Sequence, residues 1–323
     1  MQLDRLKLKK VKGDASFRFF YRKKNKKKTI IIVWANKEKE KNLLIYDAIN
    51  SLLIKNKILA PKLYKENYKK NFIEIQDFGN DTIFKLLNKK ENKKLKLYKQ
   101  SVDLLNKIQK IKQNKTKNFK GKNYKIPFYD RKILFKEAQL FSNWYVKRSL
   151  SKKKVPKIII QINRQIKFLL SKLKSKKSFF VHRDFHVSNL MYYKKKIAVI
   201  DTQDALIGNR AYDLASLIDD VRFKLNIKLK NSIYDYYIKL NRKKINKEDF
   251  LNDFEILSVL RNMKIIGIFT RLAVRDNKKK YLNLIPYAWK LIELRMRRNA
   301  TFGELKNIFD TNFSKKKGAL DES

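Results

Sequence analysis

Residues 179–189 read FFVHRDFHVSN, and residues 197–201 read IAVID, so that Asp201 follows Asn189 by twelve positions. The first run is apolar and then polar, which predicts a strand that ends in a loop. Residues 190–200 predict two further short strands joined by a turn of three lysines. Such a hairpin brings Asn189, just before its first strand, and Asp201, just after its second strand, close together at its open end.

The residue types at this end are those that phosphoryl transfer requires. An aspartate accepts the proton of the attacking hydroxyl, and an asparagine and a second aspartate hold Mg²⁺ against the phosphates of ATP. Asp184, Asn189 and Asp201 occur in the order and spacing of the catalytic loop of protein kinases. The alternative, a loop cap and a turn residue, leaves this joint spacing unexplained. We therefore predict Asp184 as the catalytic residue, Asn189 and Asp201 as metal ligands, and ATP and Mg²⁺ as cofactors.

The two histidines of the chain, His182 and His186, both lie in this stretch. Neither has partners at metal-ligand spacing, so we expect His182 to orient the catalytic loop and His186 to be structural. Arg183 is included with the catalytic residues. Arginine is scarce beside lysine, which cannot replace a planar, bidentate guanidinium. The arginines recur in the segments that carry the chemistry: Arg183, Arg210, Arg222, Arg261, Arg271 and Arg275.

Composition limits the class of protein. A chain of 323 residues, 43% hydrophobic, is long enough for one large domain or two lobes. It has no cysteine, which excludes disulfides and thiolate metal sites and makes a reducing cytoplasm the expected location. Its apolar runs are far shorter than the about 20 residues of a membrane span. The charged N-terminus, with Asp4, Arg5 and Lys7, does not predict a signal peptide.

The formal net charge of +50 is compatible with two interpretations. A basic excess favours nucleic acid or an anionic membrane as partner. Here, however, the excess is mostly lysine, is spread over almost every segment and accompanies abundant asparagine and isoleucine, as biased codon usage produces. We therefore do not expect nucleic acid as a partner.

The order of predicted elements gives an α+β fold. Residues 14–21 and 29–34 predict a β-hairpin, residues 37–54 a helix with Asn36 as its N-cap, and residues 71–76 a further strand. The chain beyond Gly79 is mostly helical in pattern, with a loop or insertion at the lysine- and asparagine-rich residues 107–125. This organisation predicts a small, β-rich N-terminal nucleotide-binding lobe over residues 1–78 and a larger, mainly helical catalytic and substrate-binding lobe over residues 79–323.

The predicted N-terminal lobe holds the candidates for nucleotide binding. A turn at Gly13, Asp14, Ala15 and Ser16 either presents backbone N–H groups and a hydroxyl to phosphates or is an ordinary hairpin turn. The strand 30–34 lacks the lysine that protein kinases carry there, so Arg18 is the first candidate for the phosphate-binding cation. Gln76 ends the strand whose backbone is expected to pair with adenine.

The chain resembles the aminoglycoside phosphotransferase and choline kinase-like family, and within it most closely the anomeric N-acetylmuramate/N-acetylglucosamine kinases of cell-wall recycling. The resemblance implies a protein-kinase-like, two-lobed fold, and an amino sugar as the small-molecule hydroxyl acceptor. It is carried by DTQDALIGNRAYDLASL at 201–217, GDASFR at 13–18, residues 127–144 and RNMKIIGIF at 261–269, with Arg271, Arg275 and Asp276.

Several residues are candidates for contacting the acceptor. Carboxylates and aromatic faces bind hydroxyl-rich ligands, which favours Asp130, Glu137 and Trp144, although core packing accounts for the tryptophan equally well. The resemblance adds Asp204 and Arg210. Arg261, Lys264, Arg271 and Arg275 fall at offsets 0, 3, 10 and 14 on one predicted helix, so this basic stripe either is solvated or faces an anion; Arg271 is the candidate for a substrate carboxylate.

Two other functions remain open. An aminoglycoside or choline-type phosphotransferase shares the chemistry, but its cationic acceptors require an acidic pocket, which a basic stripe disfavours. A non-catalytic protein of kinase-like shape that binds a polyanion is the other alternative. The presence of all three residues Asp184, Asn189 and Asp201 argues against it.

Overall fold

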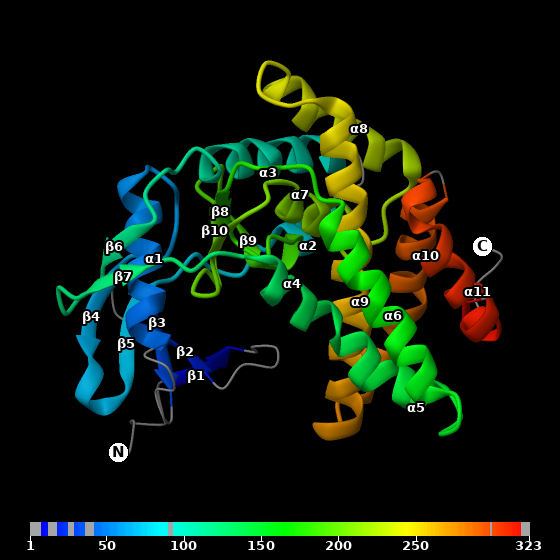
Figure 1. The fold of residues 1–323 in the computed structure, drawn as a ribbon. Helices are drawn as coiled ribbons and strands as arrows, with labels where there is room; N and C mark the ends of the chain where they lie inside the picture. The colour runs from blue at the N-terminus through cyan, green and yellow to red at the C-terminus, as the bar shows by residue number, and fades with distance from the viewer. Residues whose placement is uncertain are drawn as a thin grey trace. The chain divides into compact units, whose positions relative to one another are not determined.

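The computed structural model describes residues 8–11, 18–24, 29–35, 42–89, 93–297 and 299–317. The chain forms two compact units (Figure 1). The first unit comprises residues 1–127 and 179–207, and the second unit residues 128–178 and 208–323. None of the helices in these described ranges is long and apolar enough to cross a membrane.

A five-stranded antiparallel sheet with the strand order β1-β2-β3-β5-β4 forms part of the first unit. The predicted hairpin is confirmed, because β2 pairs with β3 along the length of both strands. Strands β1 and β4 were not predicted, because their sequences LKKV and LYKEN are too charged to show an apolar pattern. The strands are β1 (Leu8–Val11), β2 (Arg18–Lys24), β3 (Thr29–Ala35), β4 (Leu63–Asn67) and β5 (Phe72–Gln76), with a 3₁₀ turn η3 (Tyr68–Lys70) between the last two.

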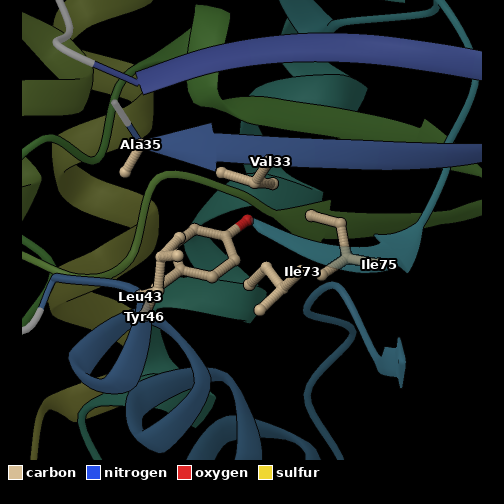
Figure 2. Close-up of a cluster of buried hydrophobic side chains, with 6 residues drawn as sticks. All are labelled: Val33, Ala35, Leu43, Tyr46, Ile73 and Ile75. Carbon is tan, nitrogen blue, oxygen red and sulfur yellow. The ribbon is translucent and has the colours of Figure 1, made fainter. Parts of the chain in front are cut away.

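Helix α1 (Asn42–Lys55) packs on this sheet. Figure 2 shows the ring of Tyr46 lying between the helix and side chains of β3 and β5. The predicted N-cap Asn36 and the predicted helix start at residue 37 lie outside the described residues. The buried side chains of this contact are Val33, Ala35, Leu43, Tyr46, Ile73 and Ile75.

Part of the segment predicted as a loop or insertion at residues 107–125 is regular secondary structure, and the rest is turn and irregular backbone. Helix α3 (Lys94–Ile108) extends into it, and β6 (Lys115–Lys117) and β7 (Asn123–Lys125) form a hairpin. The lysines of β6 are exposed, whereas Thr116 is buried and donates a hydrogen bond of 3.2 Å to the carbonyl oxygen of Ala48 in α1. Each strand has only three residues, and the single buried residue of β6 is a threonine. The sequence therefore shows no alternation of apolar and polar residues that would predict these strands.

The predicted strand–loop–hairpin centre is confirmed in the first unit. Strands β9 (Leu190–Tyr193) and β10 (Lys196–Val199) pair antiparallel, and β8 (Phe179–Val181) pairs with β11 (Leu206–Gly208). Backbone hydrogen bonds connect this hairpin to the segments before β4 and after β5, from Val199 N to Leu59 O (2.8 Å) and from Tyr192 N to Asp81 O (2.7 Å). Helix α2 (Ile83–Lys89) contacts β9.

The second unit is helical, and its longest element is the 29-residue helix α9 (Lys247–Arg275). Figure 1 shows α9 running beside α10 and α6. A side chain at Gly267 would lie 2.3 Å from the carbonyl carbon of Leu140, so this glycine permits close contact with the start of the π-helix η5. The remaining elements are α4 (Arg131–Ala138), η5 (Phe141–Val146), α5 (Lys147–Ser149), α6 (Val155–Ser171), α7 (Ala211–Ile218), α8 (Ile227–Asn241), η7 (Lys279–Leu284), α10 (Ile285–Met296), η8 (Ala300–Phe302) and α11 (Gly303–Lys317).

The sheet of one unit and the helices of the other confirm the α+β class. The lobe boundary near residue 78 stays a prediction. The last strand of the sheet ends at Gln76, just before that boundary, whereas the first unit continues to residue 127 and also includes the segment 179–207.

Candidate active site

His182 holds the loop that carries Asp184. Its ring is fully buried; Nδ1 accepts a hydrogen bond from the backbone N–H of Asp184 (3.3 Å), and Nε2 lies 3.0 Å from the carbonyl oxygen of Ile200. Since a carbonyl oxygen can only accept, Nε2 is the donor and Nδ1 the acceptor in this pair of hydrogen bonds. This side chain therefore connects the loop to the residue that precedes Asp201, as expected of a loop-orienting histidine.

Asn189 is oriented by the same loop. Its Nδ2 donates to the carbonyl oxygen of Asp184 (3.0 Å), and its backbone N–H donates to the carbonyl oxygen of His186 (2.9 Å). His186 is 5% exposed and its own N–H donates to Asp184 O (3.0 Å), in keeping with a structural role. With Nδ2 engaged, Oδ1 is the atom of the Asn189 amide that is suited to bind a cation.

The hairpin brings the metal-ligand candidates to one end, because Ile200 N donates to Asn189 O (3.0 Å) directly before Asp201. Asp201 has φ +63° and Arg183 has φ +77°. Residues other than glycine are held in this left-handed region at a cost of about 1–3 kcal/mol each, and such strain concentrates at functional sites. Arg183 directly precedes Asp184, and Asp201 is itself one of the two metal-ligand candidates.

Asp201 is held by a network of hydrogen bonds whose Arg18 and Gln203 side chains are buried. Its Oδ1 accepts hydrogen bonds from Arg18 (2.9 Å) and from Nε2 of Gln203 (3.2 Å), and Arg18 also donates to Oε1 of Gln203 (2.7 Å). Gln203 donates to Oδ2 of Asp204 (2.6 Å), and Arg183 lies 3.5 Å from the other oxygen of Asp204. The network thus joins four of the predicted site residues, and the Asp201 side chain remains 40% exposed.

The Arg18 guanidinium reaches this network from the first residue of β2, opposite Ala35 at the end of β3. It lies over the rings of Phe20 (5.7 Å) and Tyr46 (5.6 Å). Burial raises the pKa of Tyr46 to about 12, against the opposing effect of the Arg18 charge. Asn50, a hydrogen-bond partner of the Tyr46 hydroxyl, accepts a hydrogen bond of 2.6 Å from Thr202. Helix α1 therefore supports both Arg18 and the residue after Asp201.

Sequence reasoning did not identify Tyr46, Asn50, Thr202 or Gln203 as parts of the site. The nucleotide-binding candidates Gly13, Asp14, Ala15 and Ser16 lie outside the described residues. Gln76 ends β5, and its N–H donates to Lys62 O (2.8 Å), so its contact with adenine stays a prediction.

The segment after Gln76 is fixed by an arginine that we had not singled out. Arg22 of β2 donates to Oδ1 of Asp77 (2.9 Å) and to the carbonyl oxygen of Gly79 (2.8 Å). Asp77 Oδ1 also accepts the N–H of Gly79, whose φ of +83° suits a glycine. The hydrogen bonds of Arg22 therefore hold the turn Asp77–Gly79, which follows the strand expected to bind adenine, in a fixed conformation.

The donor set fits a magnesium ion bound together with a nucleotide. Over the described ranges, no group of three or more His, Cys, Asp and Glu side chains lies close enough to hold a metal by itself. Asn189 and Asp201 offer one amide oxygen and one carboxylate. Mg²⁺ is characteristically bound by one or two protein oxygens, with phosphates and water completing the octahedron.

Glu137, a candidate for contacting the acceptor sugar, already has hydrogen-bond and ion-pair partners within the second unit. It accepts a short hydrogen bond from the hydroxyl of Tyr129 and pairs with Lys264 (2.9 Å), whose Nζ also lies 3.4 Å from the hydroxyl of Tyr212. Burial raises the pKa of Tyr129 well above its ordinary value, and burial likewise raises that of Tyr212. A sugar contact of Glu137 stays a prediction.

The other residues of the second unit that are candidates for contacting the sugar differ in burial and in hydrogen-bond partners. Asp130 is exposed and caps α4 by accepting Ile133 N–H (2.8 Å). Arg210 is buried and donates to Tyr237 (2.8 Å) and Asn241 (2.7 Å). Trp144 is half-buried in η5. Their roles in substrate binding stay predictions.

The four basic residues of the expected stripe lie on one continuous helix, α9, but they differ in exposure to solvent. Arg261 and Lys264 are buried, whereas Arg275 is exposed and pairs with Asp276 (2.7 Å). Arg271 is half-buried, and burial lowers the pKa of its guanidinium. The helix is long enough for its first basic residues to face the protein interior and its last to face solvent. Binding of a carboxylate by Arg271 stays a prediction.

Known proteins resemble this chain in sequence and in fold. The sequence profile of the phosphotransferase enzyme family matches residues 7–245. The chain is 27% identical over 301 residues to the N-acetylmuramate/N-acetylglucosamine kinase of Pseudomonas aeruginosa, covering 92% of this chain and 86% of the relative. It is 27% identical over 305 residues to the kinase of the same name from Neisseria meningitidis, covering 91% and 86%. A solved amicoumacin kinase in complex with AMP-PNP, Ca²⁺ and its ligand superposes with a TM-score of 0.62 at 13% identity, over 89% of this chain and 88% of that one. The likeness confirms the protein-kinase-like fold.

Proposed function

Because the chain belongs to the phosphotransferase enzyme family, we propose that it transfers the γ-phosphoryl group of ATP to the anomeric hydroxyl of an amino sugar such as N-acetylmuramate or N-acetylglucosamine. The observation that carries this proposal is the joining of Asp184, Asn189 and Asp201 by the hydrogen bonds of one loop and one hairpin. The product is a sugar 1-phosphate, and ADP leaves.

Asp184 orients the acceptor hydroxyl and takes its proton as the oxygen bonds to the γ-phosphorus and the bond to the ADP oxygen breaks. Asn189 Oδ1 and the Asp201 carboxylate are the groups that hold Mg²⁺, which supplies charge neutralisation at the phosphates when bound. Arg18 and Arg183 provide positive charge beside Asp201 and Asp204. His182 keeps the loop in place through its two ring nitrogens.

The amino-sugar acceptor rests on the curated relatives, whose similarity covers nearly the whole chain. The segments quoted for the resemblance include Pro127 to Trp144, in which Glu137 is bonded to Tyr129 and Lys264. Within these segments we propose Asp130, Glu137, Asp204, Arg210 and Arg271 as the residues that shape the acceptor site. ATP as donor, together with a sequence that has no cysteine, favours the cytoplasm as the place of reaction.

Product analysis tests the proposal. The purified protein is incubated with ATP and Mg²⁺ and a panel of N-acetylmuramate, N-acetylglucosamine, choline, ethanolamine and spectinomycin, and products are identified by phosphorus NMR and mass spectrometry. We expect a phosphate on the anomeric oxygen of the amino sugars, recognised by its acid lability. Phosphorylation of choline or spectinomycin alone, or of none of the panel, would refute the proposed acceptor.

A further inference from the structure

The guanidinium of Arg18 occupies one side of the carboxylate that the proposed function assigns to the metal. It lies 2.9 Å from Oδ1 of Asp201, and Gln203 donates to the same oxygen from 3.2 Å. A cation bound to Asp201 would therefore sit close to a fixed positive charge. Two cations that share one carboxylate repel each other, so the affinity of Asp201 for a lone metal ion is reduced.

Arg18 is not placed to move out of the way. Its side chain is 5% exposed, whereas that of Asp201 is 40% exposed. It lies over the rings of Phe20 and Tyr46, and a second nitrogen donates to Gln203 (2.7 Å). Tyr46 is itself packed in the cluster shown in Figure 2, between α1 and the sheet. A planar guanidinium fixed on aromatic faces and by two hydrogen bonds is a permanent counter-charge rather than a mobile one.

On this basis we infer that Arg18 makes divalent-cation binding at Asn189 and Asp201 dependent on nucleotide, so that the metal binds with the nucleotide and not before it. The inference rests on the proposed function for its nucleotide and metal. The negative charge of the phosphates offsets the Arg18 charge and supplies further oxygen ligands. Without them, one amide oxygen and one partly neutralised carboxylate hold a divalent cation weakly.

The test measures binding of Mn²⁺, a paramagnetic substitute for Mg²⁺, by electron paramagnetic resonance of the free ion, with and without ADP. Wild-type protein should bind Mn²⁺ on the order of tenfold or more weakly without ADP than with it. Arg18→Gln removes the charge but keeps a donor for Asp201, and should raise nucleotide-free Mn²⁺ affinity on the order of tenfold. Adding Asp201→Asn should abolish that gain.

The matched control is Arg22→Gln, the same substitution on the same strand, at an arginine that pairs with Asp77 instead. It should leave nucleotide-free Mn²⁺ binding unchanged, and Arg18→Lys, which keeps the charge, should keep it weak. Unchanged or weaker Mn²⁺ binding by Arg18→Gln overturns the inference. If that variant does not fold, wild-type protein that binds Mn²⁺ equally well with and without ADP overturns it by itself.

Failure of the proposed function gives a different result. Wild-type protein would then show no Mn²⁺-dependent ADP binding, or would bind Mn²⁺ and ADP together without phosphorylating an amino sugar. Binding of Mn²⁺ and ADP without phosphorylation would refute the proposed amino-sugar acceptor and leave the role of Arg18 supported. Absence of Mn²⁺-dependent ADP binding would refute both the proposed function and the role of Arg18.

Discussion

Single residues of the candidate site differ in how far the sequence reveals them. Asp184 and Asn189 are five positions apart, and Asp201 ends the following hairpin, so local spacing was enough to predict their proximity. Arg18 meets Asp201 across 183 positions and Thr202 meets Asn50 across 152. Such contacts depend on how the sheet and α1 pack, which no local pattern encodes.

Glu137 illustrates the same limit in the second unit. The sequence presented it as a carboxylate for a sugar, whereas the structure surrounds it with Lys264 and the hydroxyl of Tyr129. Both partners of the ion pair are only 11% exposed in their side chains. Removing one charge of a buried pair leaves the other without compensation, and this costs more than the pair itself contributes.

We therefore predict that Glu137→Gln lowers the free energy of unfolding by roughly 3 kcal/mol. The Tyr129 hydroxyl keeps an acceptor in this variant, so the loss reports on Lys264. Urea denaturation followed by circular dichroism measures it. The double variant Glu137→Gln with Lys264→Met removes the uncompensated charge and should recover part of the stability. A single variant as stable as wild type would contradict this account of the pair.

At the scale of the elements, the buried carboxylate of Asp219 connects four helices through ion pairs and hydrogen bonds. Asp219 follows α7 and is fully buried; it accepts hydrogen bonds from Lys230 of α8 (2.8 Å), Ser258 of α9 (2.6 Å) and Arg295 of α10 (2.8 Å). Burial alone would raise its pKa, but attraction by Arg295 and Lys230 outweighs burial and lowers the pKa well below its ordinary value.

This lowered pKa sets the direction of a pH dependence. A carboxyl with a pKa near 3.9 when unfolded and a lower one when folded contributes its full stability above about pH 4 and loses it as pH falls further. Asp219→Asn should therefore cost roughly 3 kcal/mol at neutral pH, and its difference from wild type should shrink below about pH 4. Chemical denaturation across this range measures both. Asp235→Asn, at an exposed position on α8, is the control and should cost far less stability at neutral pH. A gap that stays constant into acid would contradict the assigned role.

Elements with strong local patterns were predicted well. The hairpin of β2 and β3 and the hairpin of β9 and β10 were predicted from runs of aromatic and aliphatic residues. The hairpin of β6 and β7 was not, because it is held by Thr116 on α1 and by an Asn118 turn that accepts the N–H groups of Lys120 and Lys122. These hydrogen bonds are made by threonine and asparagine side chains, and a segment rich in lysine and asparagine is predicted as a loop from its composition.

For the whole molecule, the dominant physical feature is the net charge of +50 over 323 residues. Like charges repel across the folded surface and destabilise the compact state relative to the expanded chain. Salt shortens the range of this repulsion, with a Debye length of about 10 Å at 0.1 M.

We predict that the midpoint of thermal unfolding rises when sodium chloride is increased from about 20 mM to about 300 mM, because screening weakens repulsion over one Debye length or more. Differential scanning fluorimetry measures this midpoint. Sucrose at matched osmolarity is the control and separates charge screening from general solute effects. A midpoint that falls or stays constant with salt would show that repulsion between lysines does not limit stability.

We propose that Asp184 acts on the acceptor hydroxyl in an ATP-dependent phosphotransferase, and the variant Asp184→Asn tests this role most directly. The measurement is the rate of N-acetylglucosamine and N-acetylmuramate phosphorylation by purified wild type and variant, with Mn²⁺–ADP binding to show that the variant still folds. We expect the variant to lose at least about a hundredfold in kcat and to retain nucleotide binding. A variant that phosphorylates either sugar at the wild-type rate would contradict it.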